Sequence, residues 1–126
     1  KAYVDKEAFT KIISNLISNA GKYAEKHIYI RLFTPDDTTD VFKFRIENDG
    51  DVIPERFGQK IFEPFYRIKN ENSIHGTGIG LSLAKYLAEL HEGNLMFIVN
   101  AEINIFELAL PVHQKIQFDL ERLKTR

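Results

Sequence analysis

The segment Asn15-Leu-Ile-Ser-Asn19-Ala-Gly-Lys22-Tyr23 decides how this chain folds, because it joins a helical apolar stripe to a row of hydrogen-bonding side chains. Apolar residues recur at helical spacing from Lys6 to about Lys26, directly after Asp5, a residue type that caps helix N-termini well. The stripe consists of Phe9, Ile12, Ile13, Leu16, Ile17, Ala20 and Ala24. We therefore expect one long amphipathic helix. Gly21 lies inside it and suggests a close approach by a neighbour or a ligand.

The second feature of this helix is its polar side. Asn15, Asn19, Lys22 and Tyr23 are related by steps of three or four residues, so they lie next to each other on one side. Amide oxygens are hard, neutral ligands that suit Mg²⁺, and a lysine ammonium can meet a phosphate. A solvated helix face carrying two asparagines would give the same pattern.

The rest of the chain alternates between strands and helices. Turn-forming Pro35-Asp36-Asp37 separates two alternating segments and predicts a hairpin, and Gly93 is expected to stop the second long helix. The expected elements are strands at 28–34 and 41–48, a short helix at 54–60, a polar loop at 66–76, a helix at 77–91 and a hairpin of strands at 95–99 and 103–110. This order predicts a two-layer α/β (α+β) sandwich whose sheet is mixed or largely antiparallel and is covered on one face by helices.

Composition fits one domain and favours no nucleic-acid or membrane partner. The chain has 126 residues, of which 44% are hydrophobic, with 17 Lys+Arg against 18 Asp+Glu and no cysteine. No apolar run approaches the roughly 20 residues that span a bilayer, and the first residues resemble the interior of a longer protein. We expect a catalytic domain at 1–112 and a tail or linker at 113–126.

A glycine-rich segment, His75-Gly-Thr-Gly-Ile-Gly80-Leu81, opens the second helix. Glycine lets backbone N–H groups approach a phosphate, and a helix N-terminus supplies unpaired donors. A flexible hinge before a helix would have the same composition. The segment is neither a P-loop nor a Rossmann turn, because no Lys-Ser/Thr follows and no strand leads directly into it.

Two further segments carry candidate residues. Asn48-Asp-Gly-Asp-Val-Ile-Pro54 ends a strand with polar groups that could accept a hydrogen bond from an exocyclic amine, although strand-ending turns are often this polar. Ile61-Phe-Glu-Pro-Phe-Tyr-Arg67 is rich in aromatic residues, which usually pack in a core, but Arg67 could reach a terminal phosphate.

Taken in chain order, these segments resemble four motifs of sensor histidine kinase catalytic domains: the asparagine box (15–23), the first glycine box (48–54), the phenylalanine box (61–67) and the second glycine box (76–81). These domains belong to the superfamily shared by type II topoisomerases, Hsp90 and MutL. The resemblance runs from about Tyr3 to Pro111, and Leu87-Ala-Glu-Leu-His-Glu-Gly93 resembles the helix end that follows. It implies a domain that binds ATP and Mg²⁺.

The resemblance also implies roles for single residues. Asn19 would be a direct Mg²⁺ ligand, with Asn15 ligating the metal or orienting beside it. Asn19, Lys22 and Arg67 would be the catalytic residues, with Lys22 and Arg67 meeting phosphate. Tyr23 would pack near the adenosine, and segment 66–76 would be the ATP lid. The nucleotide-binding set would be completed by Asn48, Asp49, Gly50, Ile53, Phe62, Gly76, Thr77, Gly78, Ile79, Gly80 and Leu81, with Phe106 also in the apolar adenine pocket.

The sequence departs from the family pattern in the first glycine box. Asn48 stands where the family has the carboxylate that binds adenine, and Val52 stands where it has a second glycine. Either the Asn48 carbonyl accepts from the adenine amine, or Asp49 rotates in to do so. None of His27, His75, His91 and His113 has the setting of a phosphoacceptor.

The resemblance implies phosphoryl transfer from Mg-ATP to a histidine on a dimerisation domain of the same parent protein, outside this chain. A response regulator or receiver domain would follow, in a cytoplasmic setting, with neither nucleic acid nor direct membrane contact by this domain. The alternatives are a degenerate ATP-sensing module, an anti-sigma-type serine kinase, and an ATPase of the Hsp90 or topoisomerase type. The last lacks a glutamate at the expected place, since Glu7 is two turns before Asn15.

Overall fold

The computed structural model describes residues 5–66 and 79–111. In this part of the chain the long helices are α1 (Lys6–Tyr23) and α2 (Gly80–Leu90). The strands are β1 (Ile28–Phe33), β2 (Val41–Asn48), β3 (Asn94–Ile98) and β4 (Asn104–Pro111). Two one-turn 3₁₀ helices, η1 (Glu55–Phe57) and η2 (Lys60–Phe62), take the place of the single short helix expected at 54–60.

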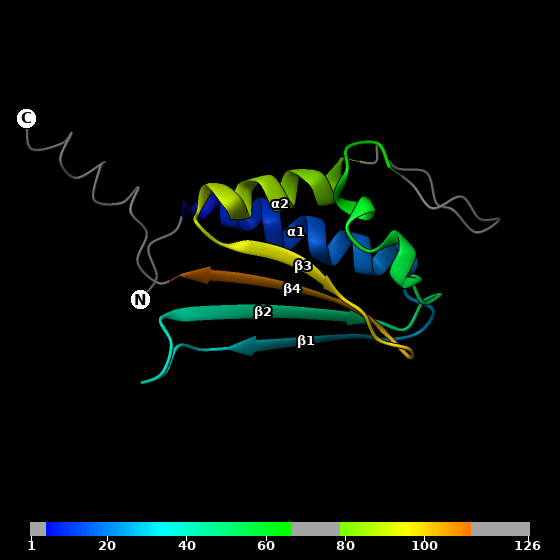
Figure 1. The fold of residues 1–126 in the computed structure, drawn as a ribbon, viewed down its shortest axis with the longest axis horizontal. Helices are drawn as coiled ribbons and strands as arrows, with labels where there is room; N and C mark the ends of the chain where they lie inside the picture. The colour runs from blue at the N-terminus through cyan, green and yellow to red at the C-terminus, as the bar shows by residue number, and fades with distance from the viewer. Residues whose placement is uncertain (1–4, 67–78, 112–126) are drawn as a thin grey trace, which may run out of the picture.

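The strands form one sheet in the order β1-β2-β4-β3, and each neighbouring pair is antiparallel. Both helices lie on the same face of this sheet (Figure 1). The predicted two-layer sandwich is therefore confirmed, and so are its two hairpins. Asn48 at the end of β2 pairs with Asn104 at the start of β4, which places two polar residues opposite each other at one end of the sheet.

The core lies between the sheet and the helices. Alternate residues of the strands point toward the helices, as the period of two requires. The buried set is Ile12, Leu16, Ala20, Ile46, Ile61, Phe62, Ala84, Ala88, Leu95, Phe97, Phe106, Leu108 and Leu110. The three alanines stand on α1 and α2, and their small side chains let the helices pack closely. Each large apolar side chain contributes about 1.5–3 kcal/mol when fully buried.

Helix α1 begins as the sequence predicts, but it ends earlier. Asp5 caps it by accepting a hydrogen bond from the Ala8 N–H. The expected end was near Lys26, whereas α1 ends at Tyr23 and Ala24 is extended. The physical reason is that the backbone N–H groups after Ala24 have another acceptor. Those of Glu25, Lys26 and His27 donate to the Asp49 carboxylate instead of to helix carbonyls.

Gly93 follows the end of α2 for a different reason than expected. The left-handed residue is Glu92, with φ of 59°, and the Gly93 N–H donates to the Ala88 carbonyl to close a Schellman motif. A Cβ on Gly93 would lie 2.3 Å from the Ala109 carbonyl oxygen. Glycine is therefore needed here for its size, because the chain passes directly against β4.

Candidate functional site

The polar side of α1 faces the beginning of α2. The Asn15 Oδ1 lies 3.8 Å from the position that a Cβ on Gly80 would occupy, so the asparagine segment and the end of the glycine segment come together. Asn15 and Asn19 are half-buried beside the buried stripe of α1. Neither side chain forms a hydrogen bond or ion pair with the described residues. Their amide oxygens are thus available to a ligand at this junction.

The end of α1 closes one side of the same region. Lys22 and Tyr23 are exposed in the last turn of α1. The Tyr23 carbonyl oxygen would lie only 1.9 Å from a Cβ on Gly50, so the first glycine box packs directly against the helix end. By contrast, a Cβ on Gly21 would have no neighbour within 4 Å among residues 5–66 and 79–111, so no described group requires a glycine there.

Asn48 and Asn104 form a buried polar pair beneath this junction. Asn48 is 2% exposed and Asn104 is 1% exposed. The Asn48 Oδ1 accepts hydrogen bonds from the Gly50 N–H at 3.0 Å and from the Asn104 Nδ2 at 3.2 Å. Asn104 is itself held by the backbone of the first glycine box, because its Oδ1 accepts from the Ile53 N–H and its Nδ2 donates to the Asp51 carbonyl.

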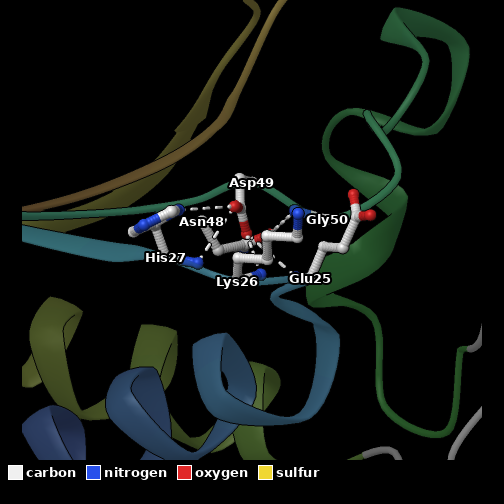
Figure 2. A network of polar contacts seen from close by, with 6 residues as sticks. All are labelled: Glu25, Lys26, His27, Asn48, Asp49 and Gly50. Carbon is white, nitrogen blue, oxygen red and sulfur yellow. Dashed lines mark hydrogen bonds and ion pairs between the residues drawn. The ribbon is translucent and has the colours of Figure 1, made fainter.

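Asp49 is engaged elsewhere. Its carboxylate accepts hydrogen bonds from the backbone N–H groups of Glu25, Lys26 and His27, each at 2.9 Å (Figure 2). These bonds, the one from His27 foremost, lower the pKa of Asp49 from 3.8 to about 2. Both carboxylate oxygens are occupied, so the expectation that Asp49 rotates toward adenine is at odds with this arrangement. Asp49 instead fastens the loop between α1 and β1.

The apolar candidates divide into two groups. Ile53 and Leu81 are half-buried and pack against the core. Phe62 and Phe106 belong to the core itself, with ring centroids 6.3 Å apart in an edge-to-face arrangement. They can form the floor under a bound base but not an exposed wall. Val52, at the family's glycine position, is 37% exposed and does not fill the interior.

Several predicted residues lie outside the described part of the chain: Arg67, Gly76, Thr77 and Gly78, together with most of segment 66–76. Ile79 is described. Its side chain is exposed, and its carbonyl accepts the hydrogen bonds that begin α2.

The sequence reasoning missed the structural roles of two residues, Asn104 at the site and His91 at the far end of α2. Asn104 is a polar residue at the first inward position of a strand whose other inward residues are Phe106, Leu108 and Leu110, and this exception was the available signal. His91 joins the ends of the helices, because its Nδ1 donates to the Leu87 carbonyl and its Nε2 accepts from the Asp5 N–H. Both ring nitrogens are thus occupied by contacts within the protein.

The antiparallel sheet under two helices, with Asn15 of α1 close to Gly80 at the start of α2, is an α/β sandwich that fits a nucleotide-binding ATPase. The chain belongs to the family described as "Histidine kinase-, DNA gyrase B-, and HSP90-like ATPase", which it matches over residues 4–114. ATP binding is a property of this family.

The relatives found by sequence are sensor kinases. The chain is 34% identical over 109 residues to the sensor histidine kinase HprS of Escherichia coli, covering 86% of this chain and 24% of the relative. It is 31% identical over 113 residues to the adaptive-response sensory kinase SasA of Crocosphaera subtropica, covering 89% of this chain and 30% of that protein. The chain thus spans less than a third of each relative and corresponds to the histidine kinase ATPase catalytic domain.

Solved structures agree on the fold. The mycobacterial sensor histidine kinase MprB superposes with a TM-score of 0.79 at 22% identity, covering 90% of this chain and 78% of that one. The catalytic domain of the histidine kinase ThkA gives a TM-score of 0.71 at 26% identity, covering 88% of this chain and 70% of that one.

Proposed function

We propose that this domain transfers the γ-phosphate of Mg-ATP to a histidine on a dimerisation hairpin outside the sequence. The observation that carries this proposal is the approach of Asn15 on α1 to Gly80 at the start of α2. A helix N-terminus offers unpaired N–H donors to a phosphate, and the Asn15 amide oxygen lies beside it. The sequence relationship to sensor histidine kinases supports the acceptor being histidine.

The residues present fit a magnesium ion. Among the described residues no three histidine or carboxylate side chains come together as a metal cluster. By the family resemblance, a metal here would be held by Asn19 and Asn15 together with phosphate oxygens, since Mg²⁺ takes oxygen ligands and usually shares them with the phosphates of its substrate. When bound, Mg²⁺ neutralises charge on the phosphates.

The protein's own contribution is positioning and charge. Lys22 at the end of α1 supplies an exposed ammonium toward phosphate, and the first N–H groups of α2 supply donors. Asn104 and Asp49 hold the first glycine box against the α1–β1 loop, so the base-binding side is preformed. A neutral imidazole on the partner domain is already a competent nucleophile, so alignment is the main task left to the protein.

The partners follow from the same proposal. The domain would act on a histidine-bearing dimerisation domain of its parent, and a response regulator or receiver domain would take the phosphate onward. A cytoplasmic setting goes with this role. No helix in residues 5–66 or 79–111 has the length and apolar character needed to cross a membrane.

The experiment is phosphotransfer to the parent's own hairpin. The domain and the separately produced hairpin are mixed with γ-labelled ATP and Mg²⁺, and the label on the hairpin is followed. We expect an acid-labile, alkali-stable phosphate that is lost in a hairpin whose histidine is replaced by alanine. Acid-stable phosphate would indicate a serine kinase, and steady hydrolysis by the domain alone would indicate a free-standing ATPase.

A second candidate function is a nucleotide-sensing module without transfer. The observation that favours it is the replacement of the expected carboxylate by Asn48, whose oxygen is already used within the protein. Nucleotide binding without any label on the hairpin would select this alternative.

A further inference from the structure

Lys85 stands in the middle of α2 with its ammonium against neighbouring elements instead of in solvent. Its side chain is 26% exposed, whereas every other lysine in residues 5–66 and 79–111 belongs to the exposed class. A lysine normally keeps its ammonium in water, and one that is drawn inward needs partners for its three N–H donors. The contacts of this ammonium therefore indicate which parts of the fold it serves.

The first partners of the ammonium are at the start of β3. The Lys85 Nζ donates to the Leu95 carbonyl at 2.8 Å and to the Asn94 Oδ1 at 3.1 Å. These bonds join the middle of α2 to the beginning of the strand that follows it. Glu89 also lies nearby, with its Oε1 at 3.9 Å, but its side chain is 56% exposed and such surface pairs contribute little.

The next partner is an aromatic ring of the phenylalanine box. The Lys85 Nζ lies 4.9 Å from the centroid of the Phe62 ring, which is within the range of a cation–π contact. On its other side this ring packs edge to face against Phe106 of β4, at a centroid distance of 6.3 Å. The phenylalanine box is therefore held from the sheet by Phe106 and from α2 by Lys85.

The phenylalanine box depends on such contacts because its own secondary structure is short. Phe62 ends η2, a 3₁₀ helix of three residues, and a single turn of this kind does little to fix its own position. The same segment leads to Arg67, the expected phosphate contact, five residues after Phe62. The other expected phosphate contacts are the N–H groups at the start of α2, near Gly80. Lys85 thus connects the two segments that should meet the phosphates.

We propose that Lys85 is a positioning residue for phosphoryl transfer, which bridges α2, β3 and the phenylalanine box and so fixes the segment leading to Arg67. The inference rests on the proposed function, because it takes the site to align a phosphate for transfer. Alignment is sensitive to placement, since a displacement of about 1 Å can cost on the order of a hundredfold in rate. Nucleotide binding should depend less on Lys85, because Asn15 and Gly80 are not among its contacts.

The first test separates transfer from binding. Lys85→Met keeps an unbranched side chain and removes the ammonium. We expect the rate of label transfer from Mg-ATP to the hairpin to fall about tenfold, while the Kd for Mg-ATP by calorimetry changes by less than about threefold. Lys85→Arg keeps a cation that can donate to both oxygens and lie over a ring, so it should restore transfer. Loss of binding, transfer and melting temperature in parallel would indicate a merely structural role and overturn the inference.

The second test follows the phenylalanine box directly, by hydrogen exchange of its backbone amides. In Lys85→Met we expect the amides of Phe62 and Glu63 to exchange about tenfold faster, with those of β4 unchanged. The matched control is Lys60→Met, which removes an exposed lysine of η2 whose ammonium has no partner among residues 5–66 and 79–111. It should exchange and transfer like the wild type. The same changes in the control would assign them to net charge and overturn the inference.

These results separate the inference from the proposed function. If the wild type labels the hairpin and Lys85→Met labels it at the same rate, the kinase proposal stands and the role of Lys85 is wrong. If the wild type labels no hairpin but exchange at Phe62 still accelerates in Lys85→Met, the kinase proposal fails while the bridge through Lys85 is confirmed. If exchange at Phe62 is unchanged in Lys85→Met, the inference fails whatever the labelling shows.

Discussion

At the scale of single residues, Gly50 and Gly21 have different surroundings in the structure, although both lie in conspicuous motifs of the sequence. Gly50 has no room for a side chain, because a Cβ would lie 1.9 Å from the Tyr23 carbonyl oxygen. Gly21 has nothing within 4 Å of the same position. The contrast predicts opposite effects of one substitution. We expect Gly50→Ala to lower the free energy of unfolding by about 1–3 kcal/mol through overpacking.

Gly21→Ala should instead raise the free energy of unfolding by up to about 1 kcal/mol, because alanine is the better helix former. Urea unfolding followed by circular dichroism measures both variants against the wild type. Destabilisation by Gly21→Ala would show that the residue serves a contact absent from the described structure.

Asp49 predicts a pH dependence of stability. Its pKa is lowered from 3.8 to about 2 by the backbone N–H bonds of the α1–β1 loop, so the folded state favours the charged carboxylate. A lowered pKa gives stability that is fully present above the ordinary pKa and is lost as the pH falls through the folded-state value. We expect the melting temperature of the wild type to fall between pH 3.8 and about 2 partly for this reason.

The variant Asp49→Asn isolates that contribution. It should melt at a lower temperature than the wild type at pH 7, and the difference should shrink toward pH 2. Asp37→Asn, in the exposed turn between β1 and β2, is the control and should leave the profile unchanged. If the difference in melting temperature between the wild type and Asp49→Asn does not vary with pH, the charge of Asp49 does not stabilise the α1–β1 loop.

At the scale of elements, β2 and β4 are joined on the face away from the helices by an ion pair. Arg45 donates to the Glu107 Oε2 from Nε at 2.9 Å and from Nη2 at 2.6 Å, while the Glu107 side chain is only 6% exposed. Removing the arginine alone would leave a nearly buried carboxylate without its main partner. We expect Arg45→Met to cost about 1–3 kcal/mol of unfolding free energy, since the arginine itself is partly exposed.

The double variant Arg45→Met with Glu107→Leu should recover most of the unfolding free energy lost in Arg45→Met, because the nearly buried carboxylate is gone and only the exposed Lys43 loses a partner. Denaturant unfolding of both single variants and the double variant gives the coupling energy directly. If the double variant is as unstable as the sum of the two single variants, the pair is not coupled.

The elements themselves were largely predictable, and their ends were less so. The strand at 41–48 was predicted with its observed bounds, since Phe42, Phe44 and Ile46 alternate with charged residues. The end of α1 was not, because it depends on Asp49, which lies 22–24 positions away in sequence. The bounds of a strand follow from local periodicity, whereas the end of α1 follows from a contact that exists only in the folded chain.

The candidate site shows the same division. The order of the motifs identified Asn15, Asn48 and Gly80 as site residues, yet the roles of Asn48 and Asp49 were left open. They are distinguished by hydrogen bonds to Asn104 and to the α1–β1 loop, both made across the sheet or between loops. No spacing rule contains those contacts, because they depend on the register of β2 against β4.

At the scale of the whole molecule, binding should be visible as added stability. A ligand that binds only the folded chain stabilises it by about 2.7 kcal/mol when present at a hundredfold excess over Kd. We expect a thermal melt to shift upward with nucleoside triphosphate plus Mg²⁺, and much less without the metal. In Asn19→Ala we expect the same melt without ligand but no dependence on Mg²⁺.

Ser18→Ala is the matched control for that variant, because it lies next to Asn19 on the exposed side of α1. It should keep the metal-dependent shift. An Mg²⁺-dependent shift that survives in Asn19→Ala would remove Asn19 from the metal site.

The pairing of β2 with β4 has a consequence for engineering. Asn48 and Asn104 are partners although they stand 56 positions apart. The segment between them therefore leaves the sheet at the end of β2 and returns to it at the adjacent start of β4. The entropy of closing such a loop grows only with the logarithm of its length, so doubling a flexible stretch costs about 0.6 kcal/mol. Because α2 and β3 within this segment supply core residues, peptide grafts should be tolerated only in its exposed connections, such as the turn between β3 and β4.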